Sequence, residues 1–207
     1  SKQTIPHFYL ETSVNAEPMI ARRNAACLRA DTHRQAAPKK IAWDAFFVHA
    51  VGKALKKFDR MGLRLETDQL APSGTDAVGV AVDHEGELHV IAIPGPTSKT
   101  PEQISDEIRA VVGKLRAGDP EARKLRPANI TITNLGVGNV ERFTAIINPP
   151  ETSILAIGKV MPAAVVQNGK IVAQNRVSIT LSVDHRTVNG RYAADFLGAI
   201  VQELESL

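Results

Sequence analysis

Cysteine and aromatic residues are both scarce in this chain of 207 residues. Its one cysteine, Cys27, excludes a disulfide within the chain and fits a reducing compartment without proving one. Aromatic side chains make up 4% of the residues, so the core must be mainly aliphatic. No apolar run approaches the roughly 18–20 residues of a membrane span. We therefore expect no membrane partner.

Strong charge of either sign and metal-ligand spacing are also missing. The net charge of +3 is spread along the chain, which argues against a nucleic-acid partner. A small basic excess does suit an anionic small ligand. The six histidines follow no pattern of paired ligands, so we expect no metal site.

Hydrophobic periodicity predicts helices alternating with strands, followed by a second half that is mostly strand. The predicted helices cover residues 16–30, 43–58, 101–116 and 189–205. The predicted strands cover 4–12, 78–82, 88–93, 130–133, 153–160, 165–167, 171–173 and 177–183. Residues 32–40 and 68–75 are predicted connectors. We expect one domain over 1–207, an α/β (α+β) two-layer sandwich in which helices cover a mixed β-sheet.

The stretch Ser182–Gly190, with the sequence SVDHRTVNG, is the most informative part of the chain. It places His185 at the end of a predicted buried strand, just before an amphipathic helix. Histidine titrates near physiological pH, so a rigidly held one is a natural general base. A single histidine at a strand end is more often structural, and this stretch alone leaves both interpretations open. For its neighbours Asp184 and Arg186, an ion pair is favoured over a role in catalysis.

Four segments in the same order resemble the catalytic core of the dihydrolipoamide acyltransferases, relatives of chloramphenicol acetyltransferase. These are Ile5–Leu10, Ile130–Gly136 (ITITNLG), Phe143–Glu151 together with Ile154–Gly158, and the His185 motif. The resemblance covers nearly the whole chain. It implies a chloramphenicol acetyltransferase-like fold and transfer of an acyl group between a dihydrolipoyl thioester and coenzyme A.

The resemblance also implies roles for individual residues. His185 would be the general base, and Thr133 would donate to the oxyanion where the family has serine. Asn189 matches a position that is usually aspartate. Its amide cannot carry the charge of a carboxylate, but it could hold the loop or the ligand. Coenzyme A would be a substrate. Its binding residues would be Arg23, Asp83, Thr133, Asn134 and Gly158, although Arg23 could equally be a solvated helix arginine.

The family's architecture implies the partners. We expect a homotrimer with active sites between subunits, a cubic or dodecahedral assembly of such trimers, and 2-oxo acid decarboxylase and dihydrolipoamide dehydrogenase components. Lipoyl and peripheral-subunit-binding domains are not visible in the sequence, so the lipoyl group would come from a separate domain or protein. The compartment would be a bacterial cytoplasm or a mitochondrial matrix.

Two other functions remain open. One is a free-standing coenzyme A-dependent acyltransferase of the chloramphenicol acetyltransferase type, which acts on a hydroxyl acceptor. The other is a catalytically weak trimeric scaffold, an alternative that rests on threonine at the usual serine position. The acyl group, whether acetyl, succinyl or branched-chain, cannot be assigned from these residues.

Overall fold

The computed structural model describes residues 1–32, 40–66, 69–124 and 126–207, with the backbone alone for 28–32. Its helices are α1 (Glu17–Thr32), α2 (Trp43–Leu55), α3 (Pro101–Arg116) and α4 (Gly190–Glu205). Its strands are β1 (His7–Asn15), β2 (Leu63–Glu66), β3 (Gln69–Pro72), β4 (Val78–His84), β5 (Glu87–Ile93), β6 (Ile130–Asn134), β7 (Ser153–Gln167) and β8 (Lys170–Asp184). Short 3-10 helices include η1 (Asp59–Gly62).

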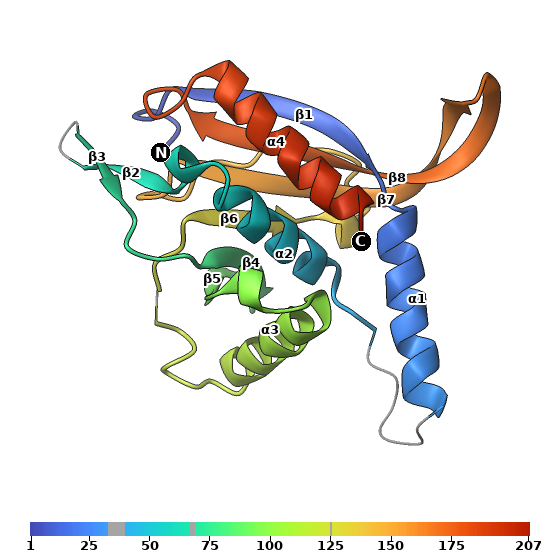
Figure 1. Ribbon diagram of the computed structural model, residues 1–207. Coiled ribbons are helices and arrows are strands. Elements are labelled where there is room, and N and C mark those ends of the chain that lie inside the picture. Colours follow the sequence, from blue (N-terminus) through green and yellow to red (C-terminus); the bar gives the residue numbers. More distant parts are fainter. Residues whose placement is uncertain (33–39, 67–68, 125) are drawn as a thin grey trace.

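Six strands form one mixed sheet in the order β1-β8-β7-β6-β4-β5 (Figure 1). The β4–β6 and β6–β7 pairs are parallel and the other pairs are antiparallel. Strands β2 and β3 form a separate two-stranded sheet. This mixed sheet under a layer of helices confirms the predicted two-layer architecture.

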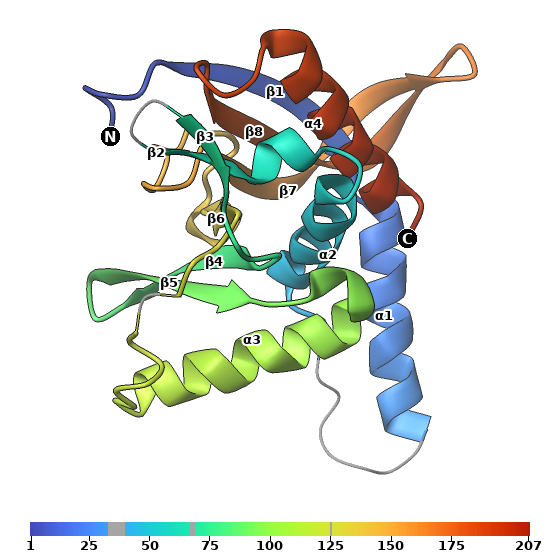
Figure 2. The same cartoon turned by 60° about the vertical axis from the view of Figure 1, so that its left-hand side comes forward.

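One aliphatic core joins the helices to one face of the large sheet. The two strongly apolar helices, α2 and α4, bury Phe46, Phe47 and Phe196 against strand residues such as Ile132 and Leu181. Burying each large apolar side chain contributes on the order of 1.5–3 kcal/mol. Helix α3 packs beside β4 and β5 at the far edge of the same layer (Figure 2).

Strands β7 and β8 form a long hairpin whose tip projects from the body in both views (Figures 1 and 2). Asn168 and Gly169, at the predicted tight turn, both have positive φ and join the two strands. The sequence predicts four shorter strands here, 153–160, 165–167, 171–173 and 177–183. The structure joins them into two continuous strands, β7 and β8, which pair with each other. Strand β7 pairs with β6 only over 154–157. Pro162 therefore lies where one edge is unpaired, and its missing N–H costs no hydrogen bond there.

Other differences lie mainly at element ends. The first strand covers 7–15 rather than 4–12, and α2 ends at Leu55 instead of continuing to residue 58. The predicted connector at 68–75 contains β3, which forms because Leu63–Glu66 offers it a pairing partner. The predicted loop at 32–40 falls largely on residues 33–39, which lie outside the described part of the chain.

The described residues contain neither a membrane-spanning helix nor a metal-binding cluster. No helix there is long and apolar enough to cross a membrane. Within the same residues, no group of three or more histidine, cysteine, aspartate or glutamate side chains could hold a metal ion.

Candidate active site

His185 lies in the turn that follows β8. Its backbone N–H donates to the carbonyl oxygen of Pro6 at 3.0 Å. Its ring packs on Phe8 of β1, with centroids 4.6 Å apart and planes inclined by 49°. The residue is exposed, and no described residue hydrogen bonds to the imidazole. The backbone is therefore fixed while the imidazole stays exposed and without a hydrogen bond from the described residues, as suits a general base.

The turn that carries His185 is anchored on both sides of the histidine. Asp184, with 1% of its surface exposed, accepts from the Arg186 guanidinium at 2.7–3.2 Å, which confirms the favoured ion pair. The Thr187 hydroxyl donates to the Asp184 carbonyl oxygen at 2.8 Å. From outside the turn, Arg60 of η1 donates to the Thr187 carbonyl oxygen at 3.1 Å. The contacts of this turn tie His185 to both the sheet and η1.

Asn189 is the N-cap of α4. Its side-chain oxygen accepts from the backbone N–H of Tyr192 at 2.9 Å. A cap of this kind stabilises a helix start by about 1 kcal/mol. The amide thus holds the junction between the histidine turn and α4, one of the two roles expected for it.

Thr133 lies on β6, with its side chain directed away from the helix layer. Strand alternation puts Ile132 and Asn134 on the helix side and Thr133 on the other. Thr133 aligns with Ala156, which aligns with Thr180 on β8, five residues before His185. Two strand spacings and five residues separate the two side chains by on the order of 15–20 Å. A single chain does not bring the two predicted catalytic groups together.

Asn134 has hydrogen bonds at both ends of its amide. It donates to Asp44 on α2 at 2.8 Å and accepts from the Gly136 N–H at 2.9 Å. Burial raises the pKa of the Asp44 carboxyl, and the hydrogen bond from Asn134 partly opposes this. Asn134 also lines a largely apolar cavity of about 240 Å³, together with Trp43, Phe47 and Gly158.

Gly158 has a structural reason to be glycine. A Cβ there would lie 1.9 Å from the Glu141 carbonyl oxygen, because residues 139–142 cross the strand at that point. The strand is also irregular here, with a register shift between Ile157 and Val160. The absence of a side chain leaves room both for this crossing and for the cavity that Gly158 lines.

Arg23 contacts Trp43, one of the residues that line the same cavity. It is half-buried, donates through Nε to the Ile41 carbonyl oxygen at 2.9 Å, and stacks over the Trp43 ring at 5.2 Å. It is therefore a positioned side chain rather than a fully solvated one. The structure brings Arg23, Asn134 and Gly158 together around Trp43, whereas Thr133 faces the other side of the sheet.

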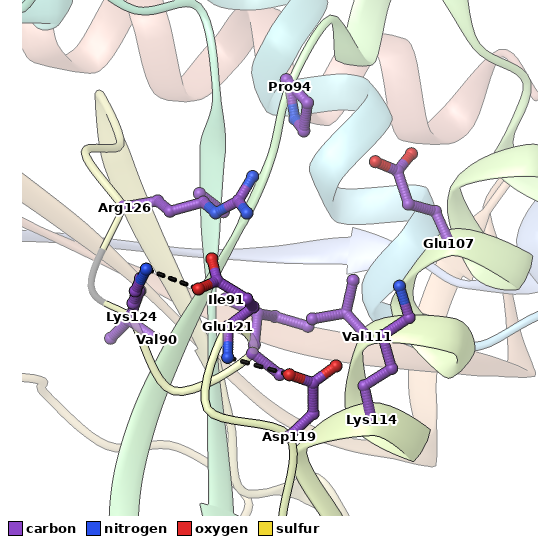
Figure 3. A pocket seen from close by; sticks show the side chains of 12 residues that line it. Val90, Ile91, Pro94, Glu107, Val111, Lys114, Asp119, Glu121, Lys124 and Arg126 are labelled. Carbon is purple, nitrogen blue, oxygen red and sulfur yellow. Dashed lines mark hydrogen bonds and ion pairs between the residues drawn. The ribbon is translucent and has the colours of Figure 1, made fainter.

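Asp83 does not join this group. It is exposed near the end of β4, opposite Leu88 on β5, and does not line the cavity. A different pocket, of about 210 Å³, lies between β5, α3 and residues 119–124 and 126 (Figure 3). Its wall mixes both signs of charge: Lys124 pairs with Glu121, Asp119 accepts from the Glu121 backbone N–H, and Lys114 lies on the α3 side (Figure 3). None of the predicted site residues lines it.

Sequence reasoning missed Phe8, Trp43 and Asp44. Phe8 supports the histidine ring only because β1 pairs with β8 in a register that aligns it with Val183. Trp43 and Asp44 open α2, where an acidic residue is explained by the helix dipole alone. The scarcity of aromatic residues is the one sequence signal that could have identified Phe8 and Trp43 as candidate site residues.

The fold and the histidine turn define a class, the acyltransferases built on a mixed sheet. The chain belongs to the family described as 2-oxoacid dehydrogenases acyltransferase (catalytic domain), whose model matches residues 1–207. A curated relative from Rickettsia bellii, a dihydrolipoyllysine-residue acetyltransferase component of the pyruvate dehydrogenase complex, is 31% identical over 206 residues. The match covers 100% of this chain and 49% of that protein. The chain thus spans about half the length of such relatives.

Solved structures agree with this membership. A probable dihydrolipoamide acetyltransferase from Listeria monocytogenes matches with a TM-score of 0.90 and 27% identity, over 99% of this chain and 86% of that one. The Azotobacter vinelandii dihydrolipoamide acetyltransferase matches with a TM-score of 0.87 and 25% identity, over 99% and 83%. The cubic core of a pyruvate dehydrogenase multienzyme complex matches with 0.88 and 26%, over 99% and 83%.

A more distant match concerns the fold alone. Chloramphenicol acetyltransferase is 14% identical, with a TM-score of 0.55 over 98% of this chain and 88% of that one. The predicted chloramphenicol acetyltransferase-like fold is therefore confirmed, and so is the predicted family.

Proposed function

We propose that this chain is the catalytic domain of an acyltransferase that moves an acyl group between a dihydrolipoyl thioester and coenzyme A. The observation that carries the proposal is the anchored turn of His185, whose backbone is bonded to Pro6 and whose exposed ring packs on Phe8. A general base needs this combination of a fixed position and free nitrogens.

Residue spacing supports the roles of the three predicted catalytic residues. The Azotobacter vinelandii structure was solved to investigate a serine, a histidine and an asparagine in catalysis by that enzyme. There the serine precedes the histidine by 52 positions, and the asparagine follows it by four. Thr133, His185 and Asn189 have the same spacing. We therefore assign Thr133 to the serine position, with its hydroxyl kept and a methyl group added.

The proposed reaction is direct transfer between thiols. His185 takes the proton of the coenzyme A thiol, and the thiolate attacks the thioester carbonyl carbon. The Thr133 hydroxyl donates to the oxyanion of the tetrahedral intermediate. When the intermediate collapses, the carbon–sulfur bond to the dihydrolipoyl group breaks. The leaving sulfur takes the proton back from His185, and Asn189 keeps the turn in place.

We infer that coenzyme A, as a substrate, uses the cavity beside Trp43. Arg23 supplies a cation at the edge of this cavity, and Asn134 and Gly158 line an apolar wall suited to a narrow chain. Asp83 does not line this cavity, so it has no part in this binding mode. The thioester exchange assay described below distinguishes acetyl, succinyl and branched-chain donors.

The distance between Thr133 and His185 in one chain supports a site shared by two copies. We propose a homotrimer in which the histidine of one copy meets the threonine of the next. The projecting β7–β8 hairpin suits a contact with a neighbour, since Val166 and Ile171 near its tip are 75% and 78% exposed. By analogy with the cubic core noted above, the trimers would assemble further. The decarboxylase and dihydrolipoamide dehydrogenase components would be partners, in a bacterial cytoplasm.

A thioester exchange assay tests the activity. Acetyl-, succinyl- and isobutyryl-coenzyme A would each be offered with free dihydrolipoamide. We expect turnover with at least one donor and a loss of 10²-fold or more, as an order of magnitude, in His185→Ala. His89→Ala is the matched control and should keep full activity. Turnover only with a hydroxyl acceptor would favour the chloramphenicol acetyltransferase type. No turnover from a folded trimer would favour the scaffold.

Mixed trimers test the shared site. His185→Ala and Thr133→Ala chains would be co-assembled at equal amounts and assayed against each pure variant. If the site lies between copies, each mixed trimer regains one intact site, and random mixing restores about a quarter of all sites. Recovery no greater than the average of the pure variants would contradict an intersubunit site.

A further inference from the structure

Two buried side-chain atoms without a hydrogen-bond partner belong to residues that line one cavity, on the side of the sheet opposite the helices. Only three buried side-chain atoms lack a hydrogen-bond partner among the described residues: Arg64 Nε, Glu151 Oε2 and Ser153 Oγ. Arg64 and Glu151 both line a cavity of about 230 Å³, together with Arg126, Asn148 and the Pro127–Ala128 and Pro149–Pro150 segments. Buried polar atoms are nearly always hydrogen bonded. Two unpaired atoms on residues of one cavity wall therefore indicate a missing polar occupant.

The hydrogen bonds already present define what the occupant can accept. Glu151 Oε1 accepts from the Thr131 hydroxyl at 2.8 Å and from Asn148 Nδ2 at 3.4 Å, so Oε2 is the carboxyl oxygen left without a partner. Arg64 uses Nη2 on the Ala128 carbonyl oxygen at 3.2 Å, which leaves its Nε–H. Arg126 is exposed at the rim. Guanidinium groups only donate, so the occupant must accept hydrogen bonds.

We propose that this cavity is a binding site for a small oxyanion, a carboxylate or a phosphate, held by Arg64 and Arg126 and by the carboxyl group of Glu151. Arginine matches such anions in geometry as well as in charge. The charged side chains on the wall are Arg64, Arg126 and Glu151, so a neutral Glu151 leaves two positive charges facing the ligand. The volume exceeds the roughly 30 Å³ that one water occupies in the liquid.

The carboxyl makes binding depend on pH. Burial raises the pKa of Glu151 to about 7, and the hydrogen bonds from Thr131 and Asn148 together with the charge of Arg64 only partly oppose this. A neutral Glu151 donates a hydrogen bond to the anion, whereas an ionised Glu151 repels the anion. Binding therefore takes up a proton near neutral pH.

Isothermal titration of the assembled protein with acetate, succinate and phosphate at constant ionic strength tests the site. We expect saturable binding of at least one anion, weaker at pH 8.5 than at pH 6 by roughly tenfold or more. The preferred anion separates the carboxylate from the phosphate source. Arg64→Met and the exposed Arg126→Met should each lose binding. Arg123→Met, which removes an exposed charge from the same connector, is the matched control and should keep it.

Glu151→Gln sharpens the test. Its amide donates at every pH, so this variant should still bind the anion but lose the pH dependence and the proton uptake. The proposal is overturned by three results: no saturable binding by the folded protein, binding unchanged in Arg126→Met, or a crystal structure soaked in the anions whose cavity holds only waters or a neighbouring copy.

Discussion

The two faces of the large sheet differ in what they leave for function. The face under α2 and α4 carries aliphatic side chains, with Ile130, Ile132, Leu155, Ile179 and Leu181 all buried in the core. The alternate positions of the same strands carry Thr131, Thr133, Thr180, Ser182 and Asp184. The first face is completed within the chain. The second keeps hydroxyl and carboxyl groups, and we propose that it is completed by another copy and by ligands.

Strand alternation places the residues that stabilise the fold on one face and the residues proposed for chemistry on the other. A substitution on the helix-covered face should affect folding at every pH, and one on the polar face should affect turnover, ligand binding or the pH dependence of stability. Variants on the two faces test this separation, and a surface ion pair of α3 serves as a reference.

Phe196→Ala should have the largest effect. Phe196 is fully buried on α4 and packs edge-on to Phe58, with ring centroids 5.8 Å apart. We expect a loss of about 3–5 kcal/mol in the free energy of unfolding, measured by urea denaturation. Leu88→Ala, at a site 72% exposed, should stay within about 0.5 kcal/mol. A loss below about 1 kcal/mol for Phe196→Ala would mean that this face is not the main source of stability.

Thr133→Ala tests the polar face through activity. We expect kcat/KM for thioester exchange to fall by roughly 10²-fold, because the oxyanion loses a hydrogen-bond donor. The urea midpoint should hardly change. Thr133→Ser keeps the hydroxyl and should match or exceed the wild-type rate. If the alanine variant is as active as wild type, another group donates to the oxyanion.

Glu151→Gln tests the polar face through pH. Its folded pKa of about 7 exceeds the ordinary value of 4.5, so the folded state holds the proton more tightly than the unfolded state. Stability therefore falls as pH rises from 4.5 to 7 in the wild-type protein. The glutamine variant should avoid this loss, so its free energy of unfolding relative to wild type should be about 3 kcal/mol more favourable at pH 8 than at pH 4.5. Glu121→Gln, at the surface, should show no such gain, and equal behaviour of both variants would refute the assignment.

Glu102→Gln should have the smallest effect. Arg22 donates to this carboxylate at 3.0 Å and lowers its pKa to about 2, on the surface of α3. The pair stabilises the protein above pH 4.5, and the contribution disappears as pH falls through 2. Because both side chains are about a third exposed, we expect about 1 kcal/mol or less at pH 7. Thermal midpoints at pH 7 and pH 2 would check this, and an equal effect at both pH values would contradict it.

Several features were determined by the sequence alone, because their signals are local. Helix α3 covers the predicted residues 101–116, since Thr100 and Gln103 form a capping box at its start. The Asn168–Gly169 turn and the strand end before His185 were also predictable from neighbouring residues. The order of four motifs along the chain was enough to predict the family.

Only the tertiary structure decided which of these residues meet. It put Arg23, Asn134 and Gly158 around Trp43, directed Thr133 to the opposite face, and left Asp83 outside. It also aligned Phe8 with the strand end that carries His185, and it brought Arg64 and Glu151 to one cavity. Such contacts depend on strand order and register between segments far apart in sequence, and no local pattern of residues encodes them.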